Sequence, residues 1–188
     1  MKISDRELVR KILNGERENF EILINKYKGP IVNFVYRMVM NMENALDISQ
    51  EIFIKVFNSL HVYNPSYEFS TWLYKIATNL TIDHLRKSKV KPVSLDRDVF
   101  DEEKIGFDIP DDSMAPHKIW NEERIKESII EAIDLLPQGL KELIVLRHIS
   151  ELPYSEIAEI KGLPLGTVKN RIFRAREMIR NYLEKKNE

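Results

Sequence analysis

Helical periodicity in this chain stops near its middle, over residues 88–116. This stretch, SKVKPVSLDRDVFDEEKIGFDIPDDSMAP, contains three prolines and many aspartates, and its apolar side chains follow no repeated spacing. Proline removes a backbone donor, and a segment rich in charge and poor in apolar side chains cannot build a core of its own. The chain is therefore divided into two parts, each of which must bury its own apolar side chains.

Both flanking parts show the spacing of amphipathic helices, whereas strand patterns are nearly absent. The predicted fold class is all-α. Two small helical domains, residues 1–90 and 118–188, are expected to be joined by a flexible acidic linker, residues 91–117. At 188 residues, the chain is long enough for one ordinary domain or two small ones.

The helix boundaries follow from capping and turn residues. Ser4 and Glu7 have the spacing of a capping box, and Gly29-Pro30 is expected to end one helix and begin the next. Pro137 is expected to separate two later helices. Helices are predicted at about residues 4–15, 17–27, 30–40, 43–60, 70–87, 120–136, 138–149, 154–161 and 165–185.

The net charge of −1 conceals an uneven distribution. Residues 1–95 carry +4, residues 96–116 carry −6 and residues 117–188 carry +1, with the positive excess in the last helix. Cysteine is absent, which excludes disulfides and thiolate metal sites. No secretory leader or membrane-length apolar run is evident, so we expect a cytoplasmic protein with no direct membrane insertion.

The C-terminal stretch YSEIAEIKGLPLGTVKNRIFRARE has the layout of a helix-turn-helix, with a short helix, a tight turn at Gly162 and a longer helix. On the longer helix, Val168, Ile172 and Ala175 fall on one face, which is expected to be buried. Charge alone favours a solvated amphipathic helix, but the preceding turn and short helix favour duplex DNA. The candidate DNA contacts are Gly166, Thr167, Lys169, Asn170, Arg171, Phe173, Arg174 and Arg176.

The stretch ENALDISQEIFIKVFNSL is predicted to form a helix with one broad apolar side. Its opposite side carries Asp47, Gln50, Glu51 and Ile54. An apolar Ile54 among acids and amides indicates a protein-docking surface, although this face considered alone is more often a plain solvent face.

The next predicted helix, FSTWLYKIATNLTIDHLRK, is apolar on two sides and leaves a narrow polar row. Aromatic rings and amides beside cations are what single-stranded nucleic acid requires, for stacking, base-edge hydrogen bonds and phosphate pairing. For Tyr63 and Tyr67, a role as turn residues that merely cover the domain is equally favoured. For Trp72, packing in the core is preferred. The candidate single-strand contacts are Tyr63, Tyr67, Phe69, Lys75, Asn79 and Arg86.

Three motifs in this order, ALDISQEIFIKVF, FSTWLYKIATNLTIDHLRK and LPYSEIAEIKGLPLGTVKNRIFRARE, with the acidic linker between the last two, resemble bacterial sigma factors of the extracytoplasmic-function type. The resemblance extends over nearly the whole chain. It implies two domains, called region 2 and region 4, that bind core RNA polymerase through its β′ clamp helices and β flap. It also implies promoter DNA as a ligand and an anti-sigma protein, commonly membrane-anchored, as a partner.

The resemblance further implies a role for each candidate group. Asp47, Gln50 and Glu51 match the region that docks on the clamp helices. The loop 60–70 and Asn79 match the element that captures a flipped base of the −10 promoter element. The helix from Thr167 to Arg174 matches the one that reads the −35 element, and the linker is expected to thread through the polymerase cleft.

One departure concerns the −35 reading helix. Members of the family often have Arg where this chain has Lys169 and a small residue where it has Asn170. Lysine offers a point charge rather than a two-pronged donor, and asparagine prefers adenine. The preferred upstream sequence is therefore left open.

Two other classes of function compete with this interpretation. A conventional repressor or activator would use the same helix-turn-helix without polymerase, usually as a dimer on paired half-sites. An enzyme is disfavoured because the four histidines are scattered without metal-ligand spacing and no glycine-rich phosphate loop occurs. No cofactor and no metal are therefore expected.

Overall fold

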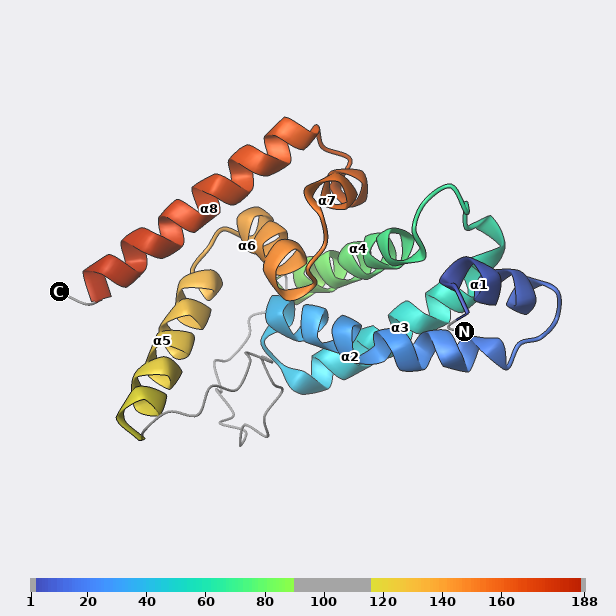
Figure 1. Ribbon diagram of the computed structural model, residues 1–188, viewed down its shortest axis with the longest axis horizontal. Coiled ribbons are helices and arrows are strands. Elements are labelled where there is room, and N and C mark those ends of the chain that lie inside the picture. Colours follow the sequence, from blue (N-terminus) through green and yellow to red (C-terminus); the bar gives the residue numbers. More distant parts are fainter. Residues whose placement is uncertain (1–2, 90–115, 187–188) are drawn as a thin grey trace.

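The structure is a computed structural model that describes residues 3–89 and 116–186. All elements within these ranges are helical, in agreement with the predicted fold class (Figure 1). The linker predicted for residues 91–117 lies outside the described residues, except that positions 116 and 117 already belong to a helix. The elements are α1 (Asp5–Leu13), α2 (Asn19–Val39), α3 (Met42–Ser59), η1 (Leu60–Val62), α4 (Phe69–Lys89), α5 (Pro116–Asp134), α6 (Gln138–Ile144), η2 (Val145–Ile149), α7 (Tyr154–Lys161) and α8 (Leu165–Lys186).

Capping side chains fix the beginnings of two helices in the N-terminal domain. The hydroxyl of Ser4 accepts a 3.3 Å hydrogen bond from the backbone N–H of Glu7, as the capping-box spacing predicts. At the start of α3, the amide oxygen of Asn41 accepts a 2.8 Å bond from the N–H of Asn44. Each cap satisfies a donor that the helix itself leaves without a partner.

The predicted break at Gly29-Pro30 is wrong, because α2 runs without interruption from Asn19 to Val39 with Pro30 inside it. A proline within a helix costs about 3 kcal/mol through the lost hydrogen bond and the ring clash. The continuous buried stripe of α2 offsets this cost, since each large apolar side chain contributes about 1.5–3 kcal/mol on burial. That stripe includes Leu23, Tyr27, Ile31, Phe34, Val35 and Met38.

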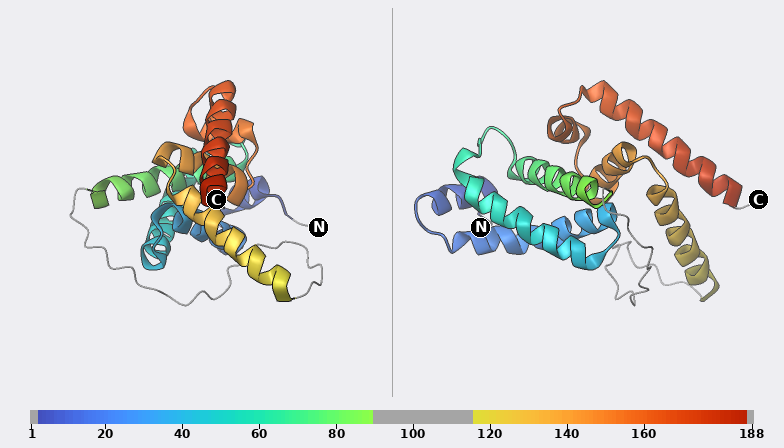
Figure 2. Two further views of the ribbon diagram at one scale, coloured as in Figure 1. Left: turned by 90° about the vertical axis from the view of Figure 1, so that its left-hand side faces the viewer. Right: turned by 180° about the vertical axis from the view of Figure 1, so that it is seen from behind.

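In the C-terminal domain, the predicted helix over residues 138–149 changes geometry part of the way along. It is α-helical through Ile144 and continues as a π-helical turn, η2, to Ile149. The helices α5 and α8 pack against each other, and the Tyr182 hydroxyl donates a 3.2 Å hydrogen bond to Glu131. The start of α8 lies against α7, so α8 spans the whole domain (Figure 2).

The two domains pack against each other in this structure. Helix α7 lies on α4, and η2 lies on α2. The buried apolar side chains of both domains form one cluster, in which Tyr74 of α4 is 3% exposed and Ile157 of α7 is fully buried. The second apolar side of α4, which the sequence pattern indicated, is thus covered by the C-terminal domain.

Candidate nucleic-acid interface

The turn between α7 and α8 depends on Gly162, whose φ of 60° lies in the left-handed region. Residues with a Cβ are strained in this conformation, whereas glycine adopts it freely. The N–H of Gly162 donates to the carbonyl of Glu159 at 3.3 Å, and the N–H of Leu163 donates to that of Ala158 at 3.0 Å. These bonds end α7 and set the direction in which α8 leaves.

Helix α8 divides into a buried and an exposed face, as its sequence periodicity predicts. Val168, Ile172 and Ala175 are at most 1% exposed and form the buried face. Thr167 is half-buried, and the other predicted contacts are exposed. The structure therefore places the following residues together along the first three turns of α8: Gly166, Thr167, Lys169, Asn170, Arg171, Phe173, Arg174 and Arg176.

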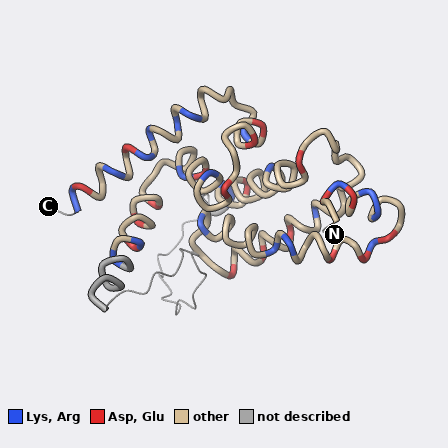
Figure 3. Tube along the Cα trace, in the orientation of Figure 1, with Lys and Arg blue, Asp and Glu red and all other residues tan. Residues whose placement is uncertain are grey.

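The cations at the start of α8 are available for a ligand. Lys169, Arg171 and Arg174 make no ion pair with any side chain that the structure describes. Farther along α8, by contrast, Arg180 lies 3.8 Å from Glu177 and 3.9 Å from Glu184. Figure 3 shows basic positions recurring along this helix. Lys169 and Arg171 lie on opposite flanks of the exposed side of α8, and Arg174 lies between them on that side. Arginine and lysine side chains in such positions can bind phosphates and base edges.

Phe173 is 64% exposed although it is large and apolar. It lies on the same face as Asn170 and Arg174, one turn or less away. Most of its ring faces solvent and is available for an apolar contact with a thymine methyl group in the major groove.

Arg176 is oriented by a side chain from another element. Its Nε and Nη2 atoms lie 3.3 and 3.0 Å from Nε2 of His148, at the end of η2. Burial, together with the nearby charges of Arg176 and Arg147, lowers the pKa of His148. A neutral His148 can accept a hydrogen bond from Arg176, which positions this guanidinium beside the exposed face of α8.

A buried ion pair holds α6 against the end of α7. The Lys161 ammonium lies 2.5 Å from the Glu142 carboxylate, whose side chain is 3% exposed. Burial raises the pKa of Glu142, while the hydrogen bond and charge of Lys161 act in the opposite direction. The pair fixes the angle of the short helix that precedes the turn.

The predicted docking residues lie together on the outer face of α3. Asp47, Gln50, Glu51 and Ile54 are all exposed, and Ile54 is 62% exposed. The opposite side of α3 is buried, as its apolar spacing predicts. This part of the molecule thus offers acids and amides around an apolar side chain.

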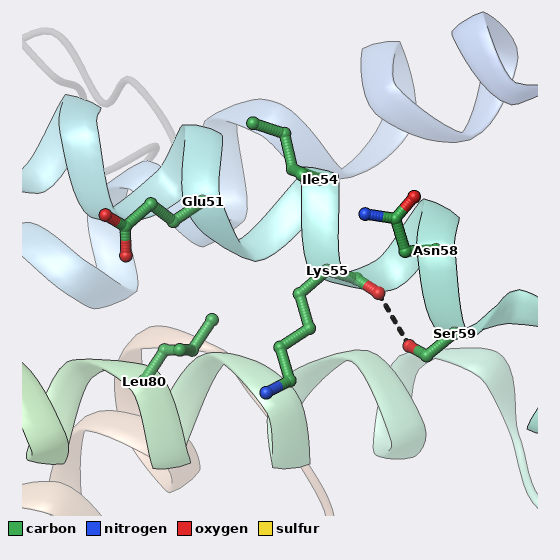
Figure 4. A pocket seen from close by; sticks show the side chains of 6 residues that line it. All are labelled: Glu51, Ile54, Lys55, Asn58, Ser59 and Leu80. Carbon is green, nitrogen blue, oxygen red and sulfur yellow. Dashed lines mark hydrogen bonds between the residues drawn. The ribbon is translucent and has the colours of Figure 1, made fainter.

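Beside this face, α3 and α4 form an open groove of about 460 Å³ (Figure 4). Ile54 and Glu51 lie at its α3 side, and Leu80 projects toward α3 from α4. The sequence pattern did not assign Lys55, Ser59 or Leu80 to a site, because Lys55 and Ser59 lie at the edge of the polar face and Leu80 belongs to a helix that is apolar on two sides. The groove is lined by Glu51, Ile54, Lys55, Asn58, Ser59 and Leu80.

The polar row on α4 is exposed as predicted. Lys75 and Asn79, four positions apart, lie on the same side of the helix, and Arg86 follows two turns later. Arg86 makes only a loose ion pair with Asp83, at 3.9 Å, and both side chains are largely exposed. This row can therefore accept a phosphate or a base edge.

Two of the predicted single-strand contacts need correction. Tyr63 is 7% exposed and Phe69 is 2% exposed, so neither ring can stack on a base in this structure. They pack with each other at a centroid distance of 5.7 Å and with the half-buried Trp72 at 5.3 and 5.9 Å. Burial in this cluster stabilises the fold more than exposure of these large aromatic rings to solvent would. Tyr67 is 49% exposed and is the aromatic side chain of the loop that remains accessible.

Within the described residues, no helix is long and apolar enough to cross a lipid bilayer. The same part of the chain contains no group of three His, Asp or Glu side chains placed to hold a metal ion. The exposed features that the structure does offer are the two polar faces, on α8 and α4, and the mixed face of α3.

Comparison with known proteins accounts for both domains. Residues 23–90 match the family described as sigma-70 region 2, and residues 126–179 match sigma-70, region 4. The chain is 36% identical to the ECF RNA polymerase sigma factor SigW of Bacillus subtilis (strain 168), over 97% of this chain and 98% of the relative. It is 33% identical to the ECF RNA polymerase sigma-E factor of Escherichia coli (strain K12), over 97% of this chain and 96% of the relative.

Solved structures share the fold. The structure of CnrH, determined in complex with the cytosolic domain of CnrY, matches with a TM-score of 0.70 at 20% identity, over 97% of this chain and 99% of that one. The sigma factor RpoE of Bartonella quintana, determined in complex with the anti-sigma factor NepR, matches with a TM-score of 0.68 at 19% identity, over 89% of this chain and 98% of that one. With both region families in order and relatives aligned over nearly its whole length, the chain belongs to the sigma-70 family, as an RNA polymerase sigma factor of the extracytoplasmic-function (ECF) type.

Proposed function

We propose that this chain binds core RNA polymerase and directs it to promoters that carry a −35 and a −10 element. Residues 1–90 serve as region 2, residues 91–117 as the connecting linker and residues 118–188 as region 4. The observation that carries this proposal is the pairing, in one chain, of a helix-turn-helix with unpaired cations and a second domain with a polar row next to a mixed docking face. A conventional repressor or activator that binds duplex DNA without polymerase does not require a single-strand face or a polymerase-docking face in its second domain.

In this proposal, α8 reads the −35 element in the major groove. Lys169, Arg171 and Arg174 supply charge for phosphates and base edges, and Asn170 supplies an amide that pairs well with adenine. The N-terminus of α8, around Gly166, offers backbone N–H groups to a phosphate. Arg176, held by His148, provides a further phosphate contact.

The row on α4 and the loop before it hold the non-template strand of the −10 element. Asn79 provides the amide for a flipped base, while Lys75 and Arg86 bind phosphates. Tyr67 is the ring available for stacking. Tyr63 and Phe69 act from the core by supporting this loop rather than by touching DNA.

The outer face of α3 docks on the β′ clamp helices of the polymerase, with Ile54 as its apolar centre and Asp47, Gln50 and Glu51 around it. The C-terminal domain contacts the β flap. Catalysis of RNA synthesis remains with the polymerase, and the protein acts in the cytoplasm without a cofactor. We expect an anti-sigma protein, commonly membrane-anchored, to compete with the polymerase for the α3 face. Structures of sigma factors with this fold have been solved in complex with anti-sigma proteins.

Run-off transcription tests this proposal. Fragmented DNA of the source genome is transcribed by core polymerase with and without the purified chain, and new discrete transcripts are expected only when both are present. Their upstream sequences define the two promoter elements. Arg174→Ala should abolish most of these transcripts, whereas Arg180→Ala, an exposed arginine on the same helix that is paired with acids, serves as the matched control.

Specific duplex binding by the chain alone, with no transcripts in the presence of core polymerase, would instead support the repressor or activator. The roles of Asp47, Glu51 and Asn79 would then be lost as well. Gel shift of the same fragments by the chain without polymerase provides this second measurement.

A further inference from the structure

Helix α1 lies beside the loop that precedes α4 and is tied to it by an ion pair (Figure 1). Nη2 of Arg6 donates a 2.8 Å hydrogen bond to Oε1 of Glu68, 62 positions later in the chain. Glu68 is the last residue before α4, and its carbonyl accepts a 3.3 Å bond from the N–H of Trp72. Arg6 therefore holds the point at which the loop becomes the helix that carries Lys75 and Asn79.

The loop itself has a fixed shape. The hydroxyl of Tyr63 donates a 2.7 Å hydrogen bond to the carbonyl of Tyr67, and the N–H of Tyr67 donates to the carbonyl of Asn64 at 3.1 Å. The Asn64 side chain accepts a 2.9 Å bond from the N–H of Ser66. The buried Tyr63 thus holds in place the backbone that carries the exposed Tyr67 ring.

Arg6 also acts on Tyr63. Arg6 and Tyr63 line the same surface pocket, between α1 and the loop. Burial raises the pKa of Tyr63, and a hydrogen bond and the charge of Arg6 oppose this rise. One side chain of α1 thus reaches both ends of the loop, at Tyr63 and at Glu68. Among the described ion pairs, no other cation of α1 reaches the loop, since Arg10 pairs with Glu7 on its own helix at 3.8 Å and Lys11 forms no described pair.

The neighbouring residue fixes α1 in place. The Asp5 carboxylate accepts hydrogen bonds from the Lys26 ammonium at 2.6 and 2.8 Å and from the Tyr27 hydroxyl at 2.5 Å. The Tyr27 ring in turn lies 5.5 Å from that of Phe69, at the first position of α4. Asp5 anchors α1 to the bundle, and Arg6 can then restrain the loop against a fixed support.

We infer that Arg6, acting through Glu68 and Tyr63, is a positioning residue for the capture of the flipped −10 base. It holds the loop in the shape that accepts the base, and it does not contact DNA itself. The inference rests on the proposed function of the loop and of Asn79. Because the pair is largely exposed, with 50% and 63% of the two side chains accessible, its loss should weaken capture by about three- to fivefold rather than abolish it.

A charge-swap cycle in the holoenzyme tests this inference. Binding of a labelled single-stranded oligonucleotide that carries the −10 sequence is measured for wild type, Arg6→Glu, Glu68→Arg and the double variant. The same oligonucleotide with an abasic site at the captured position is the second ligand. Each single variant should weaken binding of the intact strand by about three- to fivefold and leave abasic binding unchanged, and the double variant should recover most of the loss.

The matched control is Arg10→Glu, which makes the same charge change one turn later on α1. The inference is overturned by an equal loss for Arg10→Glu, by an equal loss on the abasic strand or by a double variant that recovers nothing. The first two results would indicate a general charge effect, and the third a direct contact between Arg6 and DNA. A wild-type holoenzyme that fails to distinguish intact from abasic strands would instead refute base capture, and with it the proposed role of the loop.

Discussion

The hydroxyl of Thr71 in α4 donates a 2.6 Å hydrogen bond to the carboxylate of Glu156 in α7, 85 positions later in the chain. This contact joins the domain proposed to read the −10 element to the one proposed to read the −35 element. With the packing of α7 on α4, it sets an upper limit on the distance between the two reading sites.

That limit is too short for one promoter. Helical rise and the short turn between α7 and α8 keep the Cα atoms of Asn79 and Asn170 within about 50 Å of each other while the contact is closed. Two elements named −35 and −10 lie about 25 base pairs apart, or about 85 Å at 3.4 Å per step. If Asn79 and Asn170 read these two elements as proposed, the domains must separate before both elements can be bound at once.

Cross-linking the two domains should block transcription. The chain has no cysteine, so Thr71→Cys with Glu156→Cys allows a single, cleavable bismaleimide bridge. Run-off transcription should fall by about tenfold or more, because two linked sites lose their joint action when geometry prevents simultaneous binding, and it should return when the bridge is cleaved. The same variant treated with a monofunctional maleimide is the control. Full activity of the bridged protein would show that the domains read the promoter without separating.

The turn of the helix-turn-helix should be sensitive to glycine replacement only where the backbone requires it. Gly162→Ala forces a Cβ into the left-handed region, although no atom lies within 4 Å of that Cβ, and should reduce the free energy of unfolding by about 1 kcal/mol. Gly139→Ala, at an equally open position inside α6, should raise it by about 0.4–1 kcal/mol. Urea unfolding distinguishes the two, and equal effects would refute the conformational explanation.

Removing Lys161 should leave a buried carboxylate without its partner. Lys161→Met is expected to lower the free energy of unfolding by about 3–5 kcal/mol at neutral pH, because Glu142 stays buried. Burial already holds the pKa of Glu142 above its ordinary value, and the loss of Lys161 removes the effect that opposes this rise. The folded variant therefore binds a proton more readily than the unfolded chain.

The sign of the pH dependence follows from this shift. The stability that Lys161→Met lacks at neutral pH should return as the pH falls through the raised pKa of Glu142, and it should be fully present below the ordinary value of 4.5. The double variant Lys161→Met with Glu142→Leu should lie near wild type at neutral pH. A single variant whose deficit is independent of pH would contradict this account of Glu142.

His148 should make the protein less stable in acid. Its pKa is lowered by burial and by Arg176 and Arg147, so protonation below the ordinary value of 6.5 favours the unfolded chain. The stability that neutral His148 provides above that value is lost as the pH falls through its folded pKa. Between about pH 7.5 and about pH 5.5, on either side of the ordinary histidine pKa, wild type should lose more stability than His148→Gln in urea unfolding. Equal losses would show that other groups titrate.

Sequence periodicity correctly predicted the buried and exposed positions of helices that have one apolar face. The buried Val168, Ile172 and Ala175 and the exposed residues between them follow directly from 3.6 residues per turn. The break at Pro30 was wrong, because local propensity cannot report the tertiary burial that offsets its cost. Such burial depends on neighbours that are distant in the sequence.

The same reason explains why the burial of two candidate stacking rings was not evident from the sequence. Aromatic residues in a loop give the same sequence pattern whether their rings stack on a base or on each other. Only the fold shows that Tyr63 and Phe69 pack together. The contacts Thr71–Glu156 and Arg6–Glu68 join positions more than 60 apart, and no local pattern signals them. Polar residues at exposed helix positions were predictable, and the side chains that hold them in place were not.

Phe173 allows stability and DNA reading to be separated. At 64% exposure, its ring contributes little to the fold, so Phe173→Ala should change the free energy of unfolding by no more than about 0.5 kcal/mol. If the ring contacts a thymine methyl, affinity for the −35 duplex should fall by about five- to tenfold, within the range for loss of one base contact. Met178→Ala, at an apolar position beyond the reading segment that is 38% exposed, should leave −35 affinity unchanged. Unchanged −35 affinity for Phe173→Ala in fluorescence anisotropy would remove the ring from the interface and leave recognition to Asn170 and the arginines beside it.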